Sequence, residues 1–182
     1  KKVLLPKVFG TYLLDKLTCN DDLDLFVMCS SAITLTGKIS GLAYTTANTY
    51  LDAFSDYRKA LGKNVLCIDW ASWQETGMIK NTKINENKEI FEMLKPQIGV
   101  VAFKKLIFSK SHKVIVGKLN TKSQTFELKN YLPFSFDEEV LNVKEKGEGG
   151  ETSNISVGDV ILTGNDDGNY TSTQQAIGNI WK

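Results

Sequence analysis

Leu23-Asp-Leu-Phe-Val-Met-Cys29 is a short, almost continuous apolar stretch, and it decides the fold of this chain. Strands that are buried on both faces of a parallel sheet have this composition, because helices cover them on either side. Two further stretches are of the same kind: Asn64-Val-Leu-Cys-Ile-Asp-Trp70 and Lys113-Val-Ile-Val-Gly117. The three stretches predict three strands of a parallel sheet.

Helical patterns separate the strands. Residues 6–17 repeat apolar side chains at helical spacing and begin at Pro6, which suits a first helical turn because it lacks an N–H group. Residues 43–61 show the same periodicity and stop before Gly62, a typical helix terminator. The face of this helix that is expected to be buried contains four apolar residues: Ala47, Leu51, Phe54 and Leu61.

The alternation of strands and helices continues toward the C-terminus. Residues 86–95 and 98–109 predict two shorter helices on either side of Pro96, and the polar residues 30–41 predict a loop. This order is typical of an α/β fold in which helices cover both faces of a doubly wound parallel sheet. Reactive groups in such sheets gather beyond the carboxyl ends of the strands, here at Ser31 and residues 70–72.

Composition narrows the classes of function. The 182 residues are 42% hydrophobic with a formal net charge of +1, so we expect one globular core and no strong attraction to nucleic acid or acidic membranes. The single histidine, His112, and the three cysteines lack zinc-ligand spacing, and we expect Cys29 and Cys67 to be buried free thiols. No apolar run reaches the ~20 residues of a membrane-spanning helix, and no signal peptide is evident, so the cytoplasm is the expected compartment.

The chain changes character after residue 141. Residues 142–173 are dominated by glycine, Ser/Thr and charged residues, which bury too little apolar surface to offset the entropy of ordering. We interpret this segment as a flexible linker. Residues 174–182 resemble the start of an unfinished amphipathic helix, and the first residue is not Met. We therefore expect the chain to be a piece of a longer protein, with residues 1–141 as its folded part.

Four polar side chains have the spacing needed to reduce a carbonyl group. Tyr44 and Asn48 are one helical turn apart, Ser31 lies thirteen residues before Tyr44, and Lys7 lies in the first helix. Hydride addition to a carbonyl carbon places negative charge on the oxygen, so an acid is needed there. A phenol fills that role when a lysine ammonium lies nearby, because the cation favours the phenolate. A serine adds a hydrogen bond to the oxygen, and an asparagine orients the lysine or a water that returns the proton.

Each of these residues also has an ordinary interpretation. A single tyrosine in an amphipathic helix is usually a packing residue, an asparagine there is usually solvated, and Lys7 is one of 22 basic residues. Any pair alone would be weak evidence. The combination across three elements of one α/β pattern is what favours a reductase site.

The same residues carry a resemblance to a known family. The stretch Tyr44-Thr-Thr-Ala-Asn48-Thr-Tyr-Leu-Asp-Ala-Phe54 resembles the active-site helix of ketoreductase domains in modular polyketide synthases, which are short-chain dehydrogenase/reductase relatives. The segment at Lys7, Pro6-Lys-Val-Phe-Gly-Thr11, is similar to the lysine helix of this family, and residues 23–31 are similar to its strand that ends in the catalytic serine. The loop Ile68-Asp-Trp-Ala-Ser-Trp-Gln-Glu-Thr-Gly-Met78 resembles the substrate-side loop of the family. The resemblance covers about residues 1–140 and implies the C-terminal portion of a Rossmann-like fold.

The resemblance also implies roles for individual residues. Tyr44 would be the proton donor, Ser31 would steady the carbonyl, and Lys7 and Asn48 would complete the relay. The cofactor would be NADPH, and the substrate a β-ketoacyl thioester on the phosphopantetheine arm of an acyl carrier protein. The residues near the nicotinamide would be Tyr44, Trp70, Ala71 and Ser72. Trp73 and Met78 would lie near the acyl chain, although core packing is an equally good interpretation of Trp70 and Met78.

Residues 174–182 are similar to the opening of a carrier-protein helix, an interpretation that competes with an ordinary amphipathic helix. Two segments imitate a phosphate-binding turn, residues 36–41 and residues 163–168. The first lies where the family has a substrate loop. The second would place Asp166 and Asp167 against a phosphate and leaves too few residues for a nucleotide-binding fold. We reject both as phosphate sites.

We therefore expect the cofactor-binding half of the domain to lie upstream of Lys1, and the isolated chain to be inactive and to bind NADPH poorly. Two alternatives stay open. One is a stand-alone short-chain reductase or the related domain of a fatty acid synthase. The other is a catalytically silent reductase-like scaffold that docks a carrier protein.

Overall fold

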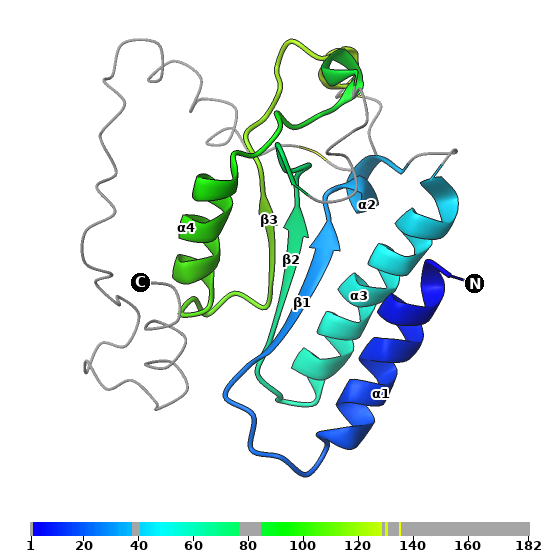
Figure 1. Cartoon of the computed structure of the whole chain (residues 1–182), viewed down its shortest axis with the longest axis vertical. Helices are drawn as coiled ribbons and strands as arrows, with labels where there is room; N and C mark the ends of the chain where they lie inside the picture. Colours follow the sequence, from blue (N-terminus) through cyan, green and yellow to red (C-terminus); the bar gives the residue numbers. More distant parts are fainter. Residues whose placement is uncertain (1, 38–40, 77–84, 129, 131–134, 136–182) are drawn as a thin grey trace.

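The computed structural model describes residues 2–37, 41–76, 85–128, 130 and 135. The proposed linker, residues 142–173, and the proposed carrier-protein helix, residues 174–182, lie outside the described residues, as does Met78. Ten elements follow one another along the described chain (Figure 1): η1 (Leu5–Phe9), α1 (Gly10–Leu17), β1 (Phe26–Ser31), α2 (Ile33–Thr36), α3 (Leu42–Ala60), β2 (Val65–Trp70), η4 (Glu86–Lys88), α4 (Pro96–Leu106), β3 (Lys113–Val116) and α5 (Gln124–Glu127). None of the described helices has the length and apolar character needed to cross a membrane.

The described strands form one parallel sheet in the order β1-β2-β3. Phe26 pairs with Val65 at one end of the β1–β2 ladder, and Ser31 pairs with Trp70 at the other. Trp70 in turn pairs with Val116 of β3. The carboxyl ends of the strands therefore meet at one edge of the sheet, as the sequence predicts.

Helices cover both faces of the sheet. Figure 1 shows α1 and α3 side by side on one face and α4 on the other. The core under α3 contains residues of that helix and of β1 and β2: Phe26, Met28, Leu51, Phe54, Val65 and Cys67. The core under α4 contains Leu66, Ile68 and Ile107, with Phe103 and Leu106 packed against them. The α/β prediction with helices on both faces is thus confirmed.

The long helix α3 follows the sequence pattern closely. It runs from Leu42 to Ala60, and Ala47, Leu51 and Phe54 are buried as predicted. Gly62 ends it with a φ of 72°, a left-handed conformation that glycine adopts without strain, and its N–H donates to the Lys59 carbonyl. The prediction that Leu61 lies on the buried face of this helix is wrong. It lies beyond the last helical turn and is 54% exposed.

Two other predictions need correction. The loop expected over residues 30–41 contains the end of β1 and the short helix α2. The helix expected over residues 86–95 is reduced to the 3₁₀ turn η4. The chain after it is extended, because its backbone bonds to other segments: Glu92 N–H to the Lys118 carbonyl and Leu94 N–H to the Ser72 carbonyl. Pro96 then begins α4 at its first turn instead of separating two helices.

Strand β1 is covered on one face only by the described residues. Its side chains alternate between buried and exposed, and Val27 is 36% exposed while Met28 is 4% exposed. Cys29 is exposed, which corrects the prediction of a buried thiol, whereas Cys67 of β2 is buried as expected. The apolar run predicts a strand, but the sequence does not show which of its faces other described elements cover.

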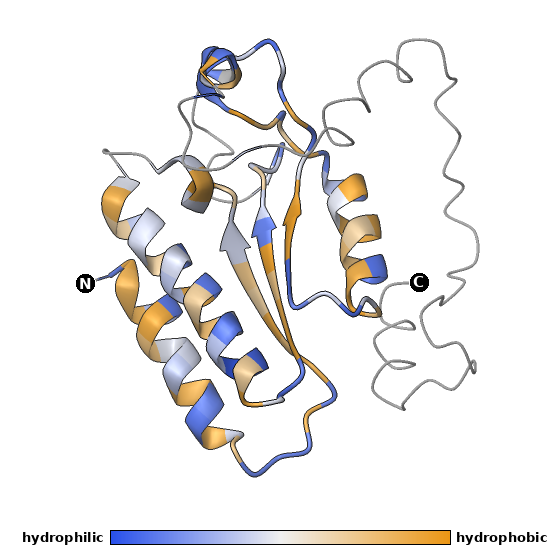
Figure 2. Cartoon of the chain, turned by 180° about the vertical axis from the view of Figure 1, so that it is seen from behind, coloured by the Kyte–Doolittle hydropathy of each residue, from blue (hydrophilic) through white to orange (hydrophobic). Residues whose placement is uncertain are grey.

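The first helical segment is joined to α3 by a buried ion pair. Arg58 of α3 donates to the carboxylate of Asp15 of α1, and the two residues are 3% and 7% exposed. The Arg58 guanidinium also lies 4.1 Å from the ring centroid of Phe26. Many residues along this helical segment are apolar (Figure 2), and among them Leu5, Phe9, Leu14 and Leu17 are at least half exposed. The ion pair therefore fixes α1 on α3 without the burial of most of its apolar side chains.

A glycine lets a loop pack closely on α4. A Cβ atom at Gly99 would lie 2.5 Å from the indole ring of Trp73, well inside van der Waals contact. Trp73 also packs edge-on against Trp70, with 5.1 Å between the ring centroids. The loop after β2 is thus held between the end of its own strand and α4.

We expect Asp15→Asn to destabilise the fold by about 3–5 kcal/mol, because it leaves the Arg58 charge buried without a countercharge. Urea unfolding monitored by circular dichroism measures the effect. The matched control is Asp56→Asn, which removes an exposed carboxylate that pairs with Lys113 and should cost less than about 1 kcal/mol. Equal losses in the two variants would contradict the role given to the buried pair.

We expect Gly99→Ala to destabilise the fold by about 1–3 kcal/mol, because the added methyl group displaces the Trp73 indole. This occurs although alanine favours a helix over glycine by roughly 1 kcal/mol. The control Gln97→Ala changes an exposed residue in the same helix. A red shift of tryptophan fluorescence in Gly99→Ala alone would support the contact, and unchanged stability and fluorescence would argue against it.

Candidate active site

Three of the predicted catalytic residues lie near the carboxyl edge of the sheet. Ser31 is the last residue of β1 and pairs with Trp70, the last residue of β2. Tyr44 and Asn48 lie in the first two turns of α3, which packs against both strands. The Ser31 hydroxyl oxygen accepts a hydrogen bond from the Ile33 N–H at 3.4 Å, a bond that does not use the hydroxyl's own hydrogen.

Lys7 brings a cation to this region from the first helical segment. Its Nζ donates to the carbonyl oxygen of Cys29 at 2.7 Å, two residues before Ser31. The same Nζ lies 5.9 Å from the ring centroid of Tyr44, within the range of a cation–π interaction. Burial lowers the pKa of Lys7 below its ordinary value, and electrostatic interactions with Cys29, Cys67 and Asp52 oppose this shift. The structure therefore places the Lys7 ammonium within cation–π range of the Tyr44 ring.

Asn48 is fully buried, in contrast to the solvated asparagine that is usual on a helix. Its Nδ2 donates to the backbone carbonyl of Tyr44 at 2.8 Å. Its Oδ1 has no hydrogen-bond partner among the described residues, although it is inaccessible to solvent. A buried acceptor without a partner costs roughly 1–3 kcal/mol, so this oxygen is well suited to receive a donor that the described residues do not supply.

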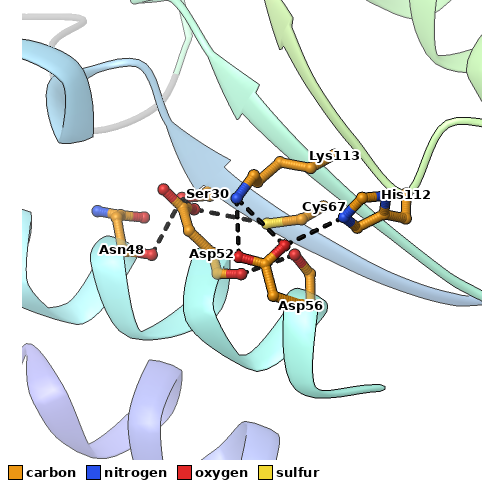
Figure 3. A network of polar contacts seen from close by, with 8 residues as sticks. Ser30, Asn48, Asp52, Asp56, Cys67, His112 and Lys113 are labelled. Carbon is orange, nitrogen blue, oxygen red and sulfur yellow. Dashed lines mark hydrogen bonds and ion pairs between the residues drawn. The ribbon is translucent and has the colours of Figure 1, made fainter. Parts of the chain in front are cut away.

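A polar network behind the predicted site joins α3 to the strands (Figure 3). The Ser30 hydroxyl donates to Asp52 Oδ1 at 2.6 Å and lies 3.2 Å from the backbone carbonyl of Asn48. Cys67 Sγ lies 3.6 Å from the same carboxylate oxygen. The network fixes the turn of α3 that carries Asn48 against the end of β1.

A second carboxyl group, Asp69, belongs to the same network. Burial, followed by the neighbouring charge of Asp52, raises the pKa of Asp69 to about 7, while Ser30 and Lys113 oppose the shift. Burial and the same two aspartates raise the pKa of the Cys67 thiol far above its ordinary value. The environment therefore disfavours negative charge on this group of side chains.

An exposed ion-pair cluster lies next to the network (Figure 3). Asp56 accepts from Lys113 Nζ at 2.9 Å and contacts His112 Nε2 at 3.1 Å. Its hydrogen bond with Lys113 lowers the pKa of Asp56. The cluster faces solvent, and we assign it no chemical role.

The residues predicted to line the nicotinamide follow β2. Ala71 is buried and its N–H donates to the Val116 carbonyl, while Ser72 accepts from Leu94 N–H. Trp70 faces the core under α4. Trp73, predicted to lie near an acyl chain, packs against Gly99 of that helix. Ala71 and Ser72 thus make backbone hydrogen bonds at the carboxyl edge of the sheet. Trp70 and Trp73 both take part in packing.

The structure brings Lys7 close to Tyr44 and Asn48 close to the Tyr44 backbone, and it places Ser31 at the same edge of the sheet. Sequence reasoning missed the network of Ser30, Asp52 and Asp69. One signal was available: Asp69 is a carboxylate inside an otherwise apolar buried strand, where a charged side chain needs a partner.

Comparisons with known proteins agree with this geometry. Residues 1–75 match the family model of the KR domain. The chain is 33% identical over 110 residues to the phthioceranic/hydroxyphthioceranic acid synthase of Mycobacterium bovis, a match that covers 56% of this chain and 5% of that protein.

Two solved structures are also similar. An N-terminal ketoreductase from the macrolactin assembly line is 30% identical, with a TM-score of 0.55 over 69% of this chain and 24% of that one. An A-type ketoreductase from a modular polyketide synthase has a TM-score of 0.67 over 78% of this chain and 30% of that one. At 22% identity it supports the Rossmann-like fold alone.

The chain thus spans only a small part of each protein that it resembles. The matched segment includes the strand that ends in Ser31, the helix with Tyr44 and Asn48, and the Lys7 segment. On these grounds residues 1–75 are similar to the KR domain family, and the described part of the chain has the fold of solved ketoreductases.

Proposed function

We propose that this chain is the catalytic part of a ketoreductase domain that reduces a β-ketoacyl thioester to the β-hydroxyacyl thioester, with NADPH as the reductant. One observation carries the proposal: the Lys7 ammonium lies 5.9 Å from the Tyr44 ring centroid and is hydrogen bonded to the strand that ends in Ser31. A cation, a phenol and a hydroxyl from three separate elements are thus gathered at one edge of the sheet.

In the proposed reaction Tyr44 donates a proton to the substrate oxygen as hydride reaches the carbon. Loss of the proton leaves a phenolate, which the adjacent Lys7 ammonium stabilises. Because the Cys29 carbonyl fixes Lys7 Nζ at 2.7 Å, little reorganisation of the cation is needed when the charge develops. The hydroxyl of Ser31 supplies a second hydrogen bond to the same substrate oxygen.

Asn48 acts in the return of the proton. Its buried Oδ1 is available to accept a hydrogen bond from a water molecule or from Lys7, while its Nδ2 is held by the Tyr44 carbonyl. Asn48 therefore orients the relay and does not itself exchange a proton.

When bound, NADPH supplies the hydride. We propose that its nicotinamide end lies against Tyr44 and residues 70–72 at the rim, and that Trp73 and Met78 border the acyl chain. The partner we propose is an acyl carrier protein that presents the substrate on its phosphopantetheine arm. The match to the KR domain model and the likeness to a ketoreductase from the macrolactin assembly line favour this substrate over those of a stand-alone reductase or a fatty acid synthase.

The remainder of the reductase domain is the other proposed partner. Two surfaces support this: the half-exposed apolar residues of η1 and α1, and the face of β1 that carries Val27 and Cys29. We propose that a further strand and helix of the same domain cover them, as the 24–30% coverage of the solved ketoreductases allows.

In the full-length protein, we expect Tyr44→Phe to lower kcat for β-ketoacyl thioester reduction by about 10²–10⁴-fold, because the proton donor is lost. NADPH oxidation at saturating substrate measures it. The matched control is Tyr57→Phe, which removes an exposed phenol from the same helix and should leave kcat unchanged. Equal rates for Tyr44→Phe and the unmodified protein would remove Tyr44 from the mechanism. No reduction of any β-ketoacyl thioester by the unmodified protein would favour the silent scaffold.

We also expect residues 1–182 alone to bind NADPH poorly. Among the described residues that follow β1 and β2, none forms a glycine-rich turn able to bind a pyrophosphate at a helix N-terminus. Enhancement of NADPH fluorescence on binding compares this chain with the full-length protein. Tight binding by the isolated chain would show that the phosphate site is not in a separate half of the domain.

A further inference from the structure

Three potential metal ligands converge on the face of the sheet beneath α3. They are Asp52 of α3 and Cys67 and Asp69 of β2, and one ligand atom of each lies within 4.8 Å of the others. Cys67 and Asp69 are 0% and 4% exposed, so this is not an ordinary solvated acidic patch. The reductase mechanism proposed above uses none of the three side chains.

One carboxylate oxygen of the group has no hydrogen-bond partner among the described residues. Asp69 Oδ1 is buried and accepts no hydrogen bond from any described residue. An unpaired buried carboxylate oxygen is costly, and two carboxylates in one dry site are costly unless a proton or a cation reduces their charge. This need is met either by a proton shared between the two carboxyl groups or by a bound cation.

The nearby side chains meet this need only in part. The Ser30 hydroxyl hydrogen bonds to Asp52 Oδ1 and carries no charge. Lys113 lies at the same pocket, but its Nζ hydrogen bonds to both carboxylate oxygens of Asp56, at 2.9 and 3.3 Å. Its charge is thus shared with an exposed carboxylate rather than bonded to the buried pair.

A pocket of about 340 Å³ leads to the two carboxylates. Asp52 and Asp69 form part of its wall together with residues of α2 and β3, and it reaches Ile115, which is 45% exposed. A small ion can enter through such a pocket, and water within it can supply a further ligand.

We propose that Asp52, Cys67 and Asp69 bind a divalent ion of the zinc class. Bonds of ~2.0–2.3 Å in a tetrahedral site place neighbouring ligand atoms ~3.3–3.8 Å apart. The distance from Cys67 Sγ to Asp52 Oδ1 is 3.6 Å. A sulfur ligand favours zinc or cobalt over magnesium or calcium, which bind oxygen ligands. On binding, the Cys67 S–H bond breaks, the sulfur electron pair forms the metal bond and the proton passes to water.

Such an ion joins α3 to β2 one helical turn beyond Asn48. It therefore acts as a cross-link behind the helix that carries Tyr44 and Asn48, and it is a separate site from the carbonyl-reducing residues. A failure of the reductase proposal would leave this inference intact.

The test is a Co²⁺ titration of the whole, chelator-treated chain, followed by absorption spectroscopy. We expect one equivalent to produce a sulfur-to-cobalt charge-transfer band and the visible bands of a tetrahedral site. Cys67→Ala should abolish the charge-transfer band, and Asp69→Asn, which conserves shape, should weaken Co²⁺ binding at least tenfold. The control Cys19→Ala removes an exposed thiol and should leave the spectrum unchanged.

Circular dichroism of each variant establishes that it is folded as the unmodified chain is. The absence of a charge-transfer band at one equivalent, or a band that survives in Cys67→Ala, would overturn the proposal. In that case the two carboxyl groups hold a shared proton and no metal ion. A band that is lost in Cys19→Ala instead would also overturn it, because the exposed thiol would then be the ligand.

Discussion

The candidate active site depends on one hydrogen bond, from Lys7 Nζ to the carbonyl oxygen of Cys29. The bond joins Lys7 of the first helical segment to a residue of β1 that lies 22 positions later in the sequence, and it uses a backbone carbonyl of that strand. A flexible lysine side chain carries about 2 kcal/mol of rotamer entropy, so a single fixed acceptor is important for its placement. The ammonium is thereby held near the Tyr44 ring while a hydrogen-bonded backbone group offsets part of its desolvation.

The second constraint is the parallel register of β1 and β2. Because Ser31 pairs with Trp70, the serine and the loop after β2 reach the edge of the sheet at the same level. Ser30 and Ser31 point to opposite faces of the sheet, and a slip of β1 by one residue would exchange those faces. Ser30 would then lose Asp52, and the hydroxyl at the rim would be replaced by the apolar Ala32. The network beneath α3 thus helps to specify the register on which the predicted site relies.

The sequence was sufficient for those features that depend on local patterns. The three strands, the extent of α3 and its termination at Gly62 follow from periodicity and from the backbone freedom of glycine. The helix predicted over residues 86–95 is wrong. Ile90 and Leu94 are both buried, and their spacing also suits one face of a helix. Their extended conformation depends on hydrogen bonds to segments distant in the sequence, which no local pattern contains. The exposure of Cys29 and the Asp52–Asp69 contact depend in the same way on tertiary packing.

Asp52 connects the two polar sites electrostatically. Its negative charge favours the protonated form of Lys7 and disfavours ionisation of Asp69 and Cys67. A proton or a metal ion that neutralises Asp52 therefore lowers the pKa of Lys7. The same neutralisation weakens the repulsion between the Asp52 and Asp69 carboxylates. The effect on Lys7 is limited, because burial is the largest influence on its pKa and Asp52 contributes less than Cys29 or Cys67 to the opposing interactions. The Cys29 carbonyl, which carries no titratable charge, holds Lys7 in either case. The Lys7 ammonium is thus positioned by a backbone carbonyl that does not titrate. The network beneath α3 affects the pKa of Lys7 and not its position.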